Sequence, residues 1–246
     1  MLITTPQYNR PQYTKRMLEA LSKVNGIEDC RIIASVDRDE NGNVNEEIVS
    51  LLKDIEFCPV SINISKERLT CNLNTLRTMY LGFDSIDRYA DEDVICHIED
   101  DICVAPDCLD MFYNIEERVD IENQYFSVSF FNRLEEKDVN SEYWTILNRP
   151  HFVPWGFVLG KKIFREVLFS NCFCPDASHY LSWDLRFNQL REKLNLTEIF
   201  PKLSRAINIG DRGTHMWPEH WENNVKLDFW AGSVLPESRE FSIQLR

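Results

Sequence analysis

Three consecutive acidic residues, Glu99-Asp100-Asp101, are the strongest candidate for chemistry in this chain. Neighbouring carboxylates repel one another, so the triplet is costly unless a cation lies beside it. Hard divalent ions such as Mn²⁺ or Mg²⁺ prefer oxygen ligands, and they are often shared between one or two carboxylates and the phosphates of a ligand. The triplet therefore indicates a metal site that recruits a nucleoside diphosphate. The alternative is a solvated acidic turn.

The segment 209–215, with the sequence IGDRGTH, is a second candidate because it combines two glycines, two charged residues and a histidine. Such a composition suits a mobile loop that closes over a bound ligand. We expect Arg212 and His215 to pair with a pyrophosphate. His215 could also complete the shell of a metal ion, and the alternative for it is an ordinary exposed histidine.

The elements that position these residues can be predicted from the hydrophobic pattern. Apolar, β-branched runs predict strands at 2–5, 31–36, 57–64 and 94–98, and amphipathic spacing predicts helices at about 11–24, 49–52 and 73–83. This alternation is typical of a mostly parallel sheet with helices on both faces, in which ligands bind at the carboxyl ends of the strands. Arg10, Asp37 and the acidic triplet each follow a predicted strand. The second half is less regular, with strands predicted at 126–130 and 157–159 and a helix at about 181–194.

Length and composition describe an ordinary globular protein. The chain has 246 residues, of which 43% are hydrophobic and 27% charged. Its net charge of −13 would repel a polyanion over most of the surface, so non-specific binding to duplex DNA is not expected.

The sequence also bears on where the protein is found. No apolar run approaches the roughly 20 residues that a membrane-spanning helix needs, and no signal peptide is visible at the start. The eight cysteines form no C-x-x-C pair and are interpreted as buried thiols of a reducing compartment. We therefore expect a soluble cytoplasmic protein.

Several motifs, in order, resemble those of a known family. They are IIASVD at 32–37, IEDDICVAPDCLDMF at 98–112, SVSFFNRLEEKDVN at 127–140, VPWGFVLGKKIF at 153–164, SWDLRF at 182–187 and SRAINIGDRGTHMWPEHWENNVKLD at 204–228. The sequence is similar to the GT-A fold glycosyltransferases, and most similar to the catalytic core of the N-acetylglucosaminyltransferase I family. The resemblance implies a Rossmann-like α/β domain over 1–246, with a mostly parallel central sheet and a smaller mixed sheet on the acceptor side. Its nucleotide-binding half would be 1–112 and its acceptor-binding half 113–246.

The resemblance also implies roles for individual acids. Asp101 corresponds to the direct metal ligand, Glu99 and Asp100 place the metal and the ribose or sugar of the donor, and Asp37 lies near the nucleoside. Asp184 corresponds to the general base that takes the proton of the acceptor hydroxyl. A carboxylate within about 3 Å of a weakly nucleophilic alcohol is the usual way to activate it. From the residues alone, a helix N-cap is the preferred interpretation of Asp184.

Further donor and acceptor residues follow from the same resemblance. Arg10 matches the turn after the first strand that contacts the nucleotide, although an ordinary turn residue before Pro11 is the alternative, and Arg68 and Asn72 fall where family members approach the uracil. Acceptor or sugar contacts are expected from segments containing Trp155, Gly156 and Trp217. Aromatic faces stack on sugars, but most tryptophans belong to cores.

The acidic triplet and the resemblance together predict a Mn²⁺- or Mg²⁺-dependent enzyme that moves a sugar from a nucleoside diphosphate to an acceptor hydroxyl. The resemblance further implies inversion at the anomeric carbon, UDP as the nucleoside diphosphate, and a glycan or glycoprotein as the acceptor. An enzyme acting on hydroxymethylated bases of viral DNA is an alternative, for which a local basic groove is conceivable from Arg186, Arg191, Lys193, Lys202 and Arg205. A nucleotidyltransferase would need a glycine-rich first turn that the sequence lacks. An inactive sugar-binding or partner-binding module is the non-enzymatic alternative.

Overall fold

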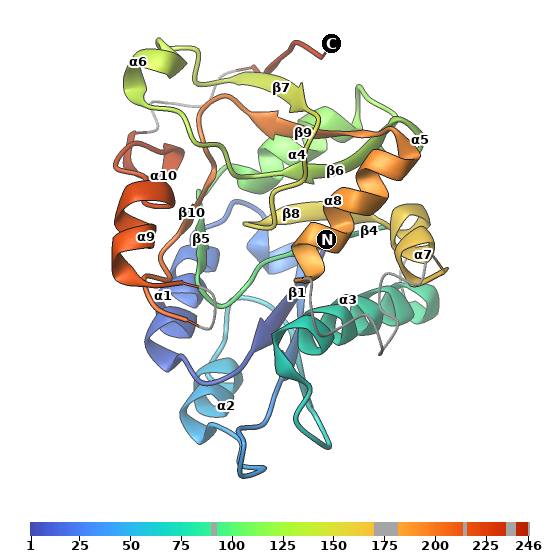
Figure 1. Cartoon of the computed structure of the whole chain (residues 1–246), viewed down its shortest axis with the longest axis vertical. Helices are drawn as coiled ribbons and strands as arrows, with labels where there is room; N and C mark the ends of the chain where they lie inside the picture. The colour runs from blue at the N-terminus through green and yellow to red at the C-terminus, as the bar shows by residue number, and fades with distance from the viewer. Residues whose placement is uncertain (90–92, 170–181, 214–215, 235–239, 246) are drawn as a thin grey trace.

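The computed structural model describes residues 1–89, 93–169, 182–213, 216–234 and 240–245. Its central feature is a nine-stranded sheet in the order β11-β7-β9-β6-β8-β4-β1-β2-β3 (Figure 1). The strands β1 (Leu2–Gln7), β2 (Arg31–Val36), β3 (Val60–Ile64) and β4 (Val94–His97) are parallel neighbours. This first half confirms the predicted alternation of strands and helices.

The second half of the sheet is mixed. β8 (Phe157–Gly160) pairs antiparallel with both β4 and β6 (Tyr125–Ser129), and beyond β6 lie β9 (Thr197–Pro201), β7 (Thr145–Arg149) and β11 (Ser242–Ile243). A separate two-stranded sheet joins β5 (Ile102–Val104) to β10 (Ala206–Asn208). The predicted strands at 126–130 and 157–159 are present, whereas β5, β7, β9, β10 and β11 were not predicted from periodicity.

Helices cover both faces of the sheet. α1 (Pro11–Leu21), α2 (Glu46–Lys53) and α4 (Cys108–Glu116) pack one hydrophobic cluster, and α3 (Thr70–Tyr89), α7 (Lys161–Phe169) and α8 (Trp183–Leu194) pack another. Alternate residues of the strands supply the two clusters, with Ile3 in the first and Leu2 in the second. The remaining helical segments are the 3₁₀ turn η1 (Ile27–Asp29), α5 (Ile121–Gln124), α6 (Glu136–Val139), α9 (Pro218–Asn224) and α10 (Ala231–Val234).

Two predicted boundaries differ from the structure. β1 does not stop at Pro6 but runs to Gln7, because its ladder with β4 covers only Leu2 to Thr4 and does not need an N–H from Pro6. The third strand begins at Val60 rather than at 57. Among the described residues, no helix combines the length and apolar composition needed to cross a bilayer.

The described cysteines are all free thiols, and Cys172 and Cys174 lie outside the described residues. The prediction that all are buried is wrong for Cys71, whose side chain is exposed at the start of α3.

Candidate active site

The carboxyl ends of β1, β2 and β4 border a cavity of about 610 Å³, which we call the donor cavity. The turn after β1, the start of α3 and the segment after β10 complete its walls. Seven of the predicted donor and metal residues line it: Arg10, Asp37, Arg68, Asn72, Glu99, Asp100 and Asp101.

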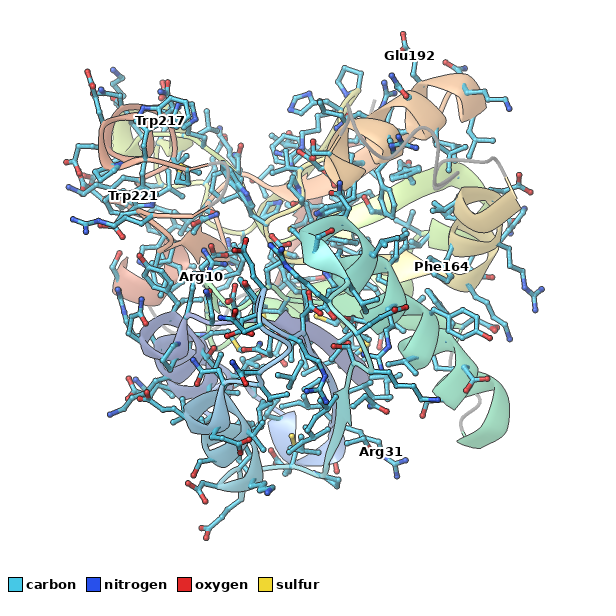
Figure 2. The ribbon with its side chains drawn as sticks, turned by 60° about the horizontal axis from the view of Figure 1, so that its bottom comes forward. Arg10, Arg31, Phe164, Glu192, Trp217 and Trp221 are labelled. Carbon is cyan, nitrogen blue, oxygen red and sulfur yellow. The ribbon has the colours of Figure 1, made fainter. Side chains whose placement is uncertain are left out.

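Arg10 lies at the centre of this cavity and contacts two of the three acids. Its Nε donates to Asp100 Oδ2 at 3.1 Å, its Nη2 pairs with Asp100 Oδ1, and its Nη1 lies 2.8 Å from Asp101 Oδ2. Burial opposes the charge of the guanidinium, but Asp100 and Asp101 outweigh it and raise the pKa of Arg10. Figure 2 shows Arg10 in the middle of the molecule, on the turn that leads into α1. Arg10 is therefore fixed against the triplet and is not an ordinary turn residue.

Arg10 does not fully compensate the crowding of the three acids, which resist ionising together. Burial raises the pKa of Glu99 well above its usual range, and the charges of Asp101, Asp100 and Asp184 raise it further. Burial also raises the pKa of Asp100, to about 6, while Arg10 opposes this shift. Three carboxyls beside one guanidinium make the place favourable for a second cation.

The donor set fits a hard divalent cation. Within the described ranges, no three carboxylate, imidazole or thiol side chains converge into a preformed metal centre. Mg²⁺-type sites, however, commonly take one or two carboxylates and complete their shell with the phosphates of the substrate. Asp101, 7% exposed and lining the cavity, has the chemistry for this role, and its assignment as the metal ligand stays a prediction.

The segment after β10 contacts the triplet through its backbone. The N–H of Ile209 donates to the carbonyl of Asp101 at 2.8 Å, and the carbonyl of Arg212 accepts from Arg10 at 3.4 Å. Gly210 lies so close to Asp101 that a Cβ there would be 2.2 Å from Oδ2. The side chain of Arg212 is exposed and lines neither cavity, and His215 lies outside the described residues. The predicted pyrophosphate contacts of Arg212 and His215 therefore stay predictions.

Asp37 fixes the start of α3. Its Oδ1 accepts from Leu69 N at 2.8 Å and from Ser65 Oγ at 3.1 Å, and its Oδ2 accepts from Thr70 N at 2.9 Å. Thr70 has a φ of 69°, which is uncommon for a β-branched residue. Asp37 thus has a structural role at the wall of the donor cavity, and its contact with a nucleoside stays a prediction.

Arg68 and Asn72 lie on either side of the same helix start. Arg68 is ion-paired with the exposed Glu40 at 3.3 Å. Asn72 Oδ1 accepts from the backbone N–H of Trp183 at 3.1 Å, which joins the start of α3 to the start of α8. Neither the ion pair nor the hydrogen bond identifies a uracil site.

Asp184 lies on α8 and lines a second cavity of about 570 Å³, which we call the acceptor cavity. The N-cap of α8 is Ser182, so the N-cap interpretation of Asp184 is wrong. Its carboxylate accepts no hydrogen bond within the described part of the chain, yet it is close enough to Glu99 to raise the pKa of that residue. Asp184 is thus both near the triplet and available to a substrate.

Trp155 lines both cavities, and its ring meets Phe131 edge-on at 4.6 Å between centroids. Gly156 has a φ of 78°, is buried before β8 and lines neither cavity. Trp217 is 56% exposed, packs against the tilted ring of His220 with 4.7 Å between centroids, and lines neither cavity. Figure 2 shows it at the periphery of the molecule. Trp155 is therefore the member of the predicted acceptor set that lies at the junction of the two cavities.

Sequence reasoning missed Arg149 and His151, which line the acceptor cavity. Both lie at or directly after the end of β7, a strand that periodicity did not predict. The rule that polar residues after strands mark the ligand edge would have found them, had β7 been recognised.

Two of the five cations considered for a DNA-binding groove are buried in the interior. Arg205 is completely buried and pairs with Asp107 at 3.1 Å, and Arg186 is 6% exposed. Lys202 is ion-paired with Glu142. Three of the five cations are thus buried or ion-paired, whereas Lys193 is exposed, and the DNA alternative stays a prediction.

No protein-family model matches the sequence, and no curated protein does. Solved structures do match the fold. S. aureus TarS 1–349 in complex with UDP-GlcNAc superposes with a TM-score of 0.52 at 12% identity, over 87% of this chain and 60% of that chain. The mannosyltransferase PcManGT from Pyrobaculum calidifontis, in complex with GDP-Man and Mn²⁺, gives a TM-score of 0.46 at 13% identity, over 68% of this chain and 46% of that chain.

The likeness to TarS shows the fold. The chain has a GT-A-like α/β architecture similar to that of TarS. This confirms the predicted fold class. Membership of the N-acetylglucosaminyltransferase I family stays a prediction.

Proposed function

We propose that this protein is a glycosyltransferase that uses a nucleotide-sugar donor. The observation that carries the proposal is the meeting of two cavities at Trp155, one containing the acidic triplet with Arg10 and the other containing Asp184. The donor cavity supplies oxygen ligands and a guanidinium, as a diphosphate requires. The acceptor cavity supplies a carboxylate without a hydrogen-bond partner in the described structure, as a hydroxyl nucleophile requires.

The proposed reaction is a single displacement. The acceptor oxygen attacks the anomeric carbon, the bond from that carbon to the diphosphate breaks as the new bond forms, and the hydroxyl proton passes to Asp184. Attack opposite the leaving group inverts the anomeric centre. Arg10 contacts Asp100 and Asp101 and would share their carboxylates with a metal ion beside the diphosphate. A Mn²⁺ or Mg²⁺ ion held by Asp101, with Glu99 and Asp100 beside it, would supply positive charge to the leaving group.

The finer substrate assignment rests on the sequence resemblance. We infer UDP as the nucleoside diphosphate and a hydroxyl of a glycan or glycoprotein as the acceptor, by likeness to the N-acetylglucosaminyltransferase I family. The TarS structure with similar architecture holds UDP-GlcNAc, which makes a UDP-sugar the first donor to test here.

Calorimetric titration tests the donor class. UDP, GDP, CDP and TDP are each titrated with and without Mn²⁺ into the wild type and into Asp101→Ala. We expect one nucleotide to bind only with Mn²⁺, and Asp101→Ala to abolish that binding. Binding of no nucleotide under any condition would contradict the proposal and favour the inactive sugar-binding or partner-binding module.

A further inference from the structure

The acceptor cavity differs in charge from the rest of the protein. The whole chain has 27 basic and 40 acidic residues. The acceptor cavity reverses this balance, because it is lined by Arg133, Arg149 and His151 and by a single acid, Asp184. Its walls also include the amides of Asn132 and Asn224.

Arg133 is the cation that is free to bind a ligand. It is exposed, and its Nη2 donates to the backbone carbonyl of Asn223 at 2.6 Å. Within the described residues it forms no ion pair. A guanidinium has five N–H groups arranged as a fork, so most of its donors remain open to the cavity.

Arg149 and Arg191 form the basic surroundings of His151. Arg149 is neutralised by the buried Glu198, with 2.6 Å between Nη2 and Oε2, and it also stacks over Phe200. Arg191 donates to the carbonyl of Leu196 and forms no ion pair in the described part of the chain. Partial burial and these two arginines lower the pKa of His151. An anion beside the imidazole would offset the repulsion between the arginines and the protonated ring.

The same cavity contains the proposed base. An anionic substrate near Asp184 would be repelled unless a cation compensated it. The guanidinium of Arg133 lines the same cavity and can do so, and the imidazole of His151 offers a ring N–H beside it. Trp155 lines both cavities and offers an aromatic face for a sugar or polyol. The cavity thus combines a carboxylate, an aromatic side chain and a guanidinium that forms no ion pair within the described residues.

We propose that the acceptor cavity binds a carbohydrate or polyol acceptor that carries an oxyanion, a phosphate or a carboxylate, held by Arg133 and His151. This inference rests on the proposed glycosyltransferase function. The oxyanion takes no part in bond making. It orients the acceptor so that a neighbouring hydroxyl gives its proton to Asp184 and its oxygen to the anomeric carbon.

The test compares acceptors that differ only in the anionic group. Methyl glucuronide is compared with methyl glucoside, and glycerol 3-phosphate with glycerol, using the UDP-sugar found by donor screening. We expect the charged member of at least one pair to have a KM about tenfold lower, as charge-assisted hydrogen bonds provide. The pair that responds distinguishes a carboxylate from a phosphate.

Variants locate the effect in the acceptor cavity. Arg133→Gln should raise the KM of the charged acceptor about tenfold and that of its neutral partner by much less. The matched control is Arg165→Gln, an exposed arginine on α7 that lines neither cavity and should change neither KM. Equal KM values within both pairs, or equal effects of Arg133→Gln on charged and neutral acceptors, would overturn the inference.

A binding measurement separates this inference from the proposed function. Calorimetry with glycerol 3-phosphate and methyl glucuronide on the wild type, Arg133→Gln and His151→Gln needs no turnover. Weaker binding by both variants supports the anion site even if no nucleotide binds, an outcome that would reject only the glycosyltransferase. Binding of neither probe, together with normal binding of UDP, would reject the anion site alone.

Discussion

The proposed role of Asp184 as the general base can be tested by a single substitution. Asp184→Asn keeps the size of the side chain and removes its ability to accept a proton, so transfer should fall by about 10²–10⁴-fold, as for loss of a general base. Affinity for UDP should not change, because Asp184 lies outside the donor cavity. Steady-state transfer and calorimetry measure the two effects.

The control for this variant is Glu192→Gln, an exposed carboxylate on the same helix (Figure 2). It makes the same type of change without touching either cavity, and it should retain full activity. Undiminished transfer by Asp184→Asn would remove Asp184 from the mechanism.

Substitution of Arg10 should change the affinity for metal and the affinity for nucleotide in opposite directions. The guanidinium and a divalent cation would share the carboxylates of Asp100 and Asp101. Arg10→Met removes one competing positive charge, so Mn²⁺ alone should bind about tenfold more tightly, while UDP in the presence of Mn²⁺ should bind about tenfold more weakly. Titration of the Mn²⁺ electron paramagnetic resonance signal measures the first effect.

Arg31→Met is the matched control, because Arg31 is exposed at the amino end of β2, opposite the ligand edge (Figure 2). It should change neither affinity. Weaker binding of Mn²⁺ by Arg10→Met would mean that Arg10 orders the carboxylates for the metal rather than competing with it.

At the scale of elements, the segment after β10 is positioned by contact with the triplet. Gly210→Ala would place a Cβ 2.2 Å from Asp101 Oδ2, so either the segment or the carboxylate must move. We expect the variant to remain folded and its affinity for UDP with Mn²⁺ to fall at least tenfold, because Asp101 loses its position. Circular dichroism and calorimetry check the two statements.

Gly160→Ala serves as the control, since the nearest atom to its Cβ would be Glu122 Oε1 at an ordinary 3.5 Å. It should bind nucleotide like the wild type. Normal nucleotide binding by Gly210→Ala would show that the segment can shift without disturbing the site.

Elements also explain which parts of the structure could be predicted from the sequence. β1, β2 and β4 are buried on both faces, and this produces the continuous apolar runs that predicted them. β7 and β9 mix polar and apolar residues, and β9 ends in Pro201, so their pattern does not differ from that of a loop. The same holds for the site residues. Those that follow β1, β2 and β4 could be predicted, whereas those at or after the end of β7 could not.

Close approach in space is the other feature that the sequence did not reveal. The sequence predicts that Asp100 and Asp101 need a cation, but it does not show that Arg10 pairs with them. Arg10 and Asp100 are 90 positions apart in the sequence. Gly210 was noted only as part of a flexible composition, whereas its role is to leave room for Asp101. Such contacts depend on the crossing of several strands rather than on any local pattern.

At the scale of the whole molecule, the two halves are joined into one sheet. β4 of the donor half pairs with β8 of the acceptor half over four residues, from Val94 opposite Gly160 to His97 opposite Phe157. The hydrophobic clusters also continue across this junction, with Ile95 and Leu159 in the same cluster. This continuity predicts that 1–246 unfolds as a single cooperative domain.

A buried ion pair offers a way to test that cooperativity. Glu198 is completely buried and accepts from Ser127 of β6, from Arg149 of β7 and from the backbone of Val153 before β8. Glu198→Gln leaves the guanidinium of Arg149 buried without its counter-charge, which typically costs about 3–5 kcal/mol. The free energy of unfolding should fall by about this amount, and Glu198→Gln with Arg149→Met should recover part of it.

The location of the tryptophans makes the experiment selective. All six lie between residues 144 and 230, so their fluorescence reports the acceptor half, whereas far-ultraviolet circular dichroism reports both halves. If the sheet unfolds as one unit, urea transitions followed by the two probes coincide in the wild type, and Glu198→Gln shifts both by the same amount. The contrary outcome is a fluorescence transition that moves to lower urea while the circular dichroism transition splits into two steps. It would show that the two halves fold independently, because the donor half would then stay folded after the loss of an ion pair that lies entirely in the acceptor half.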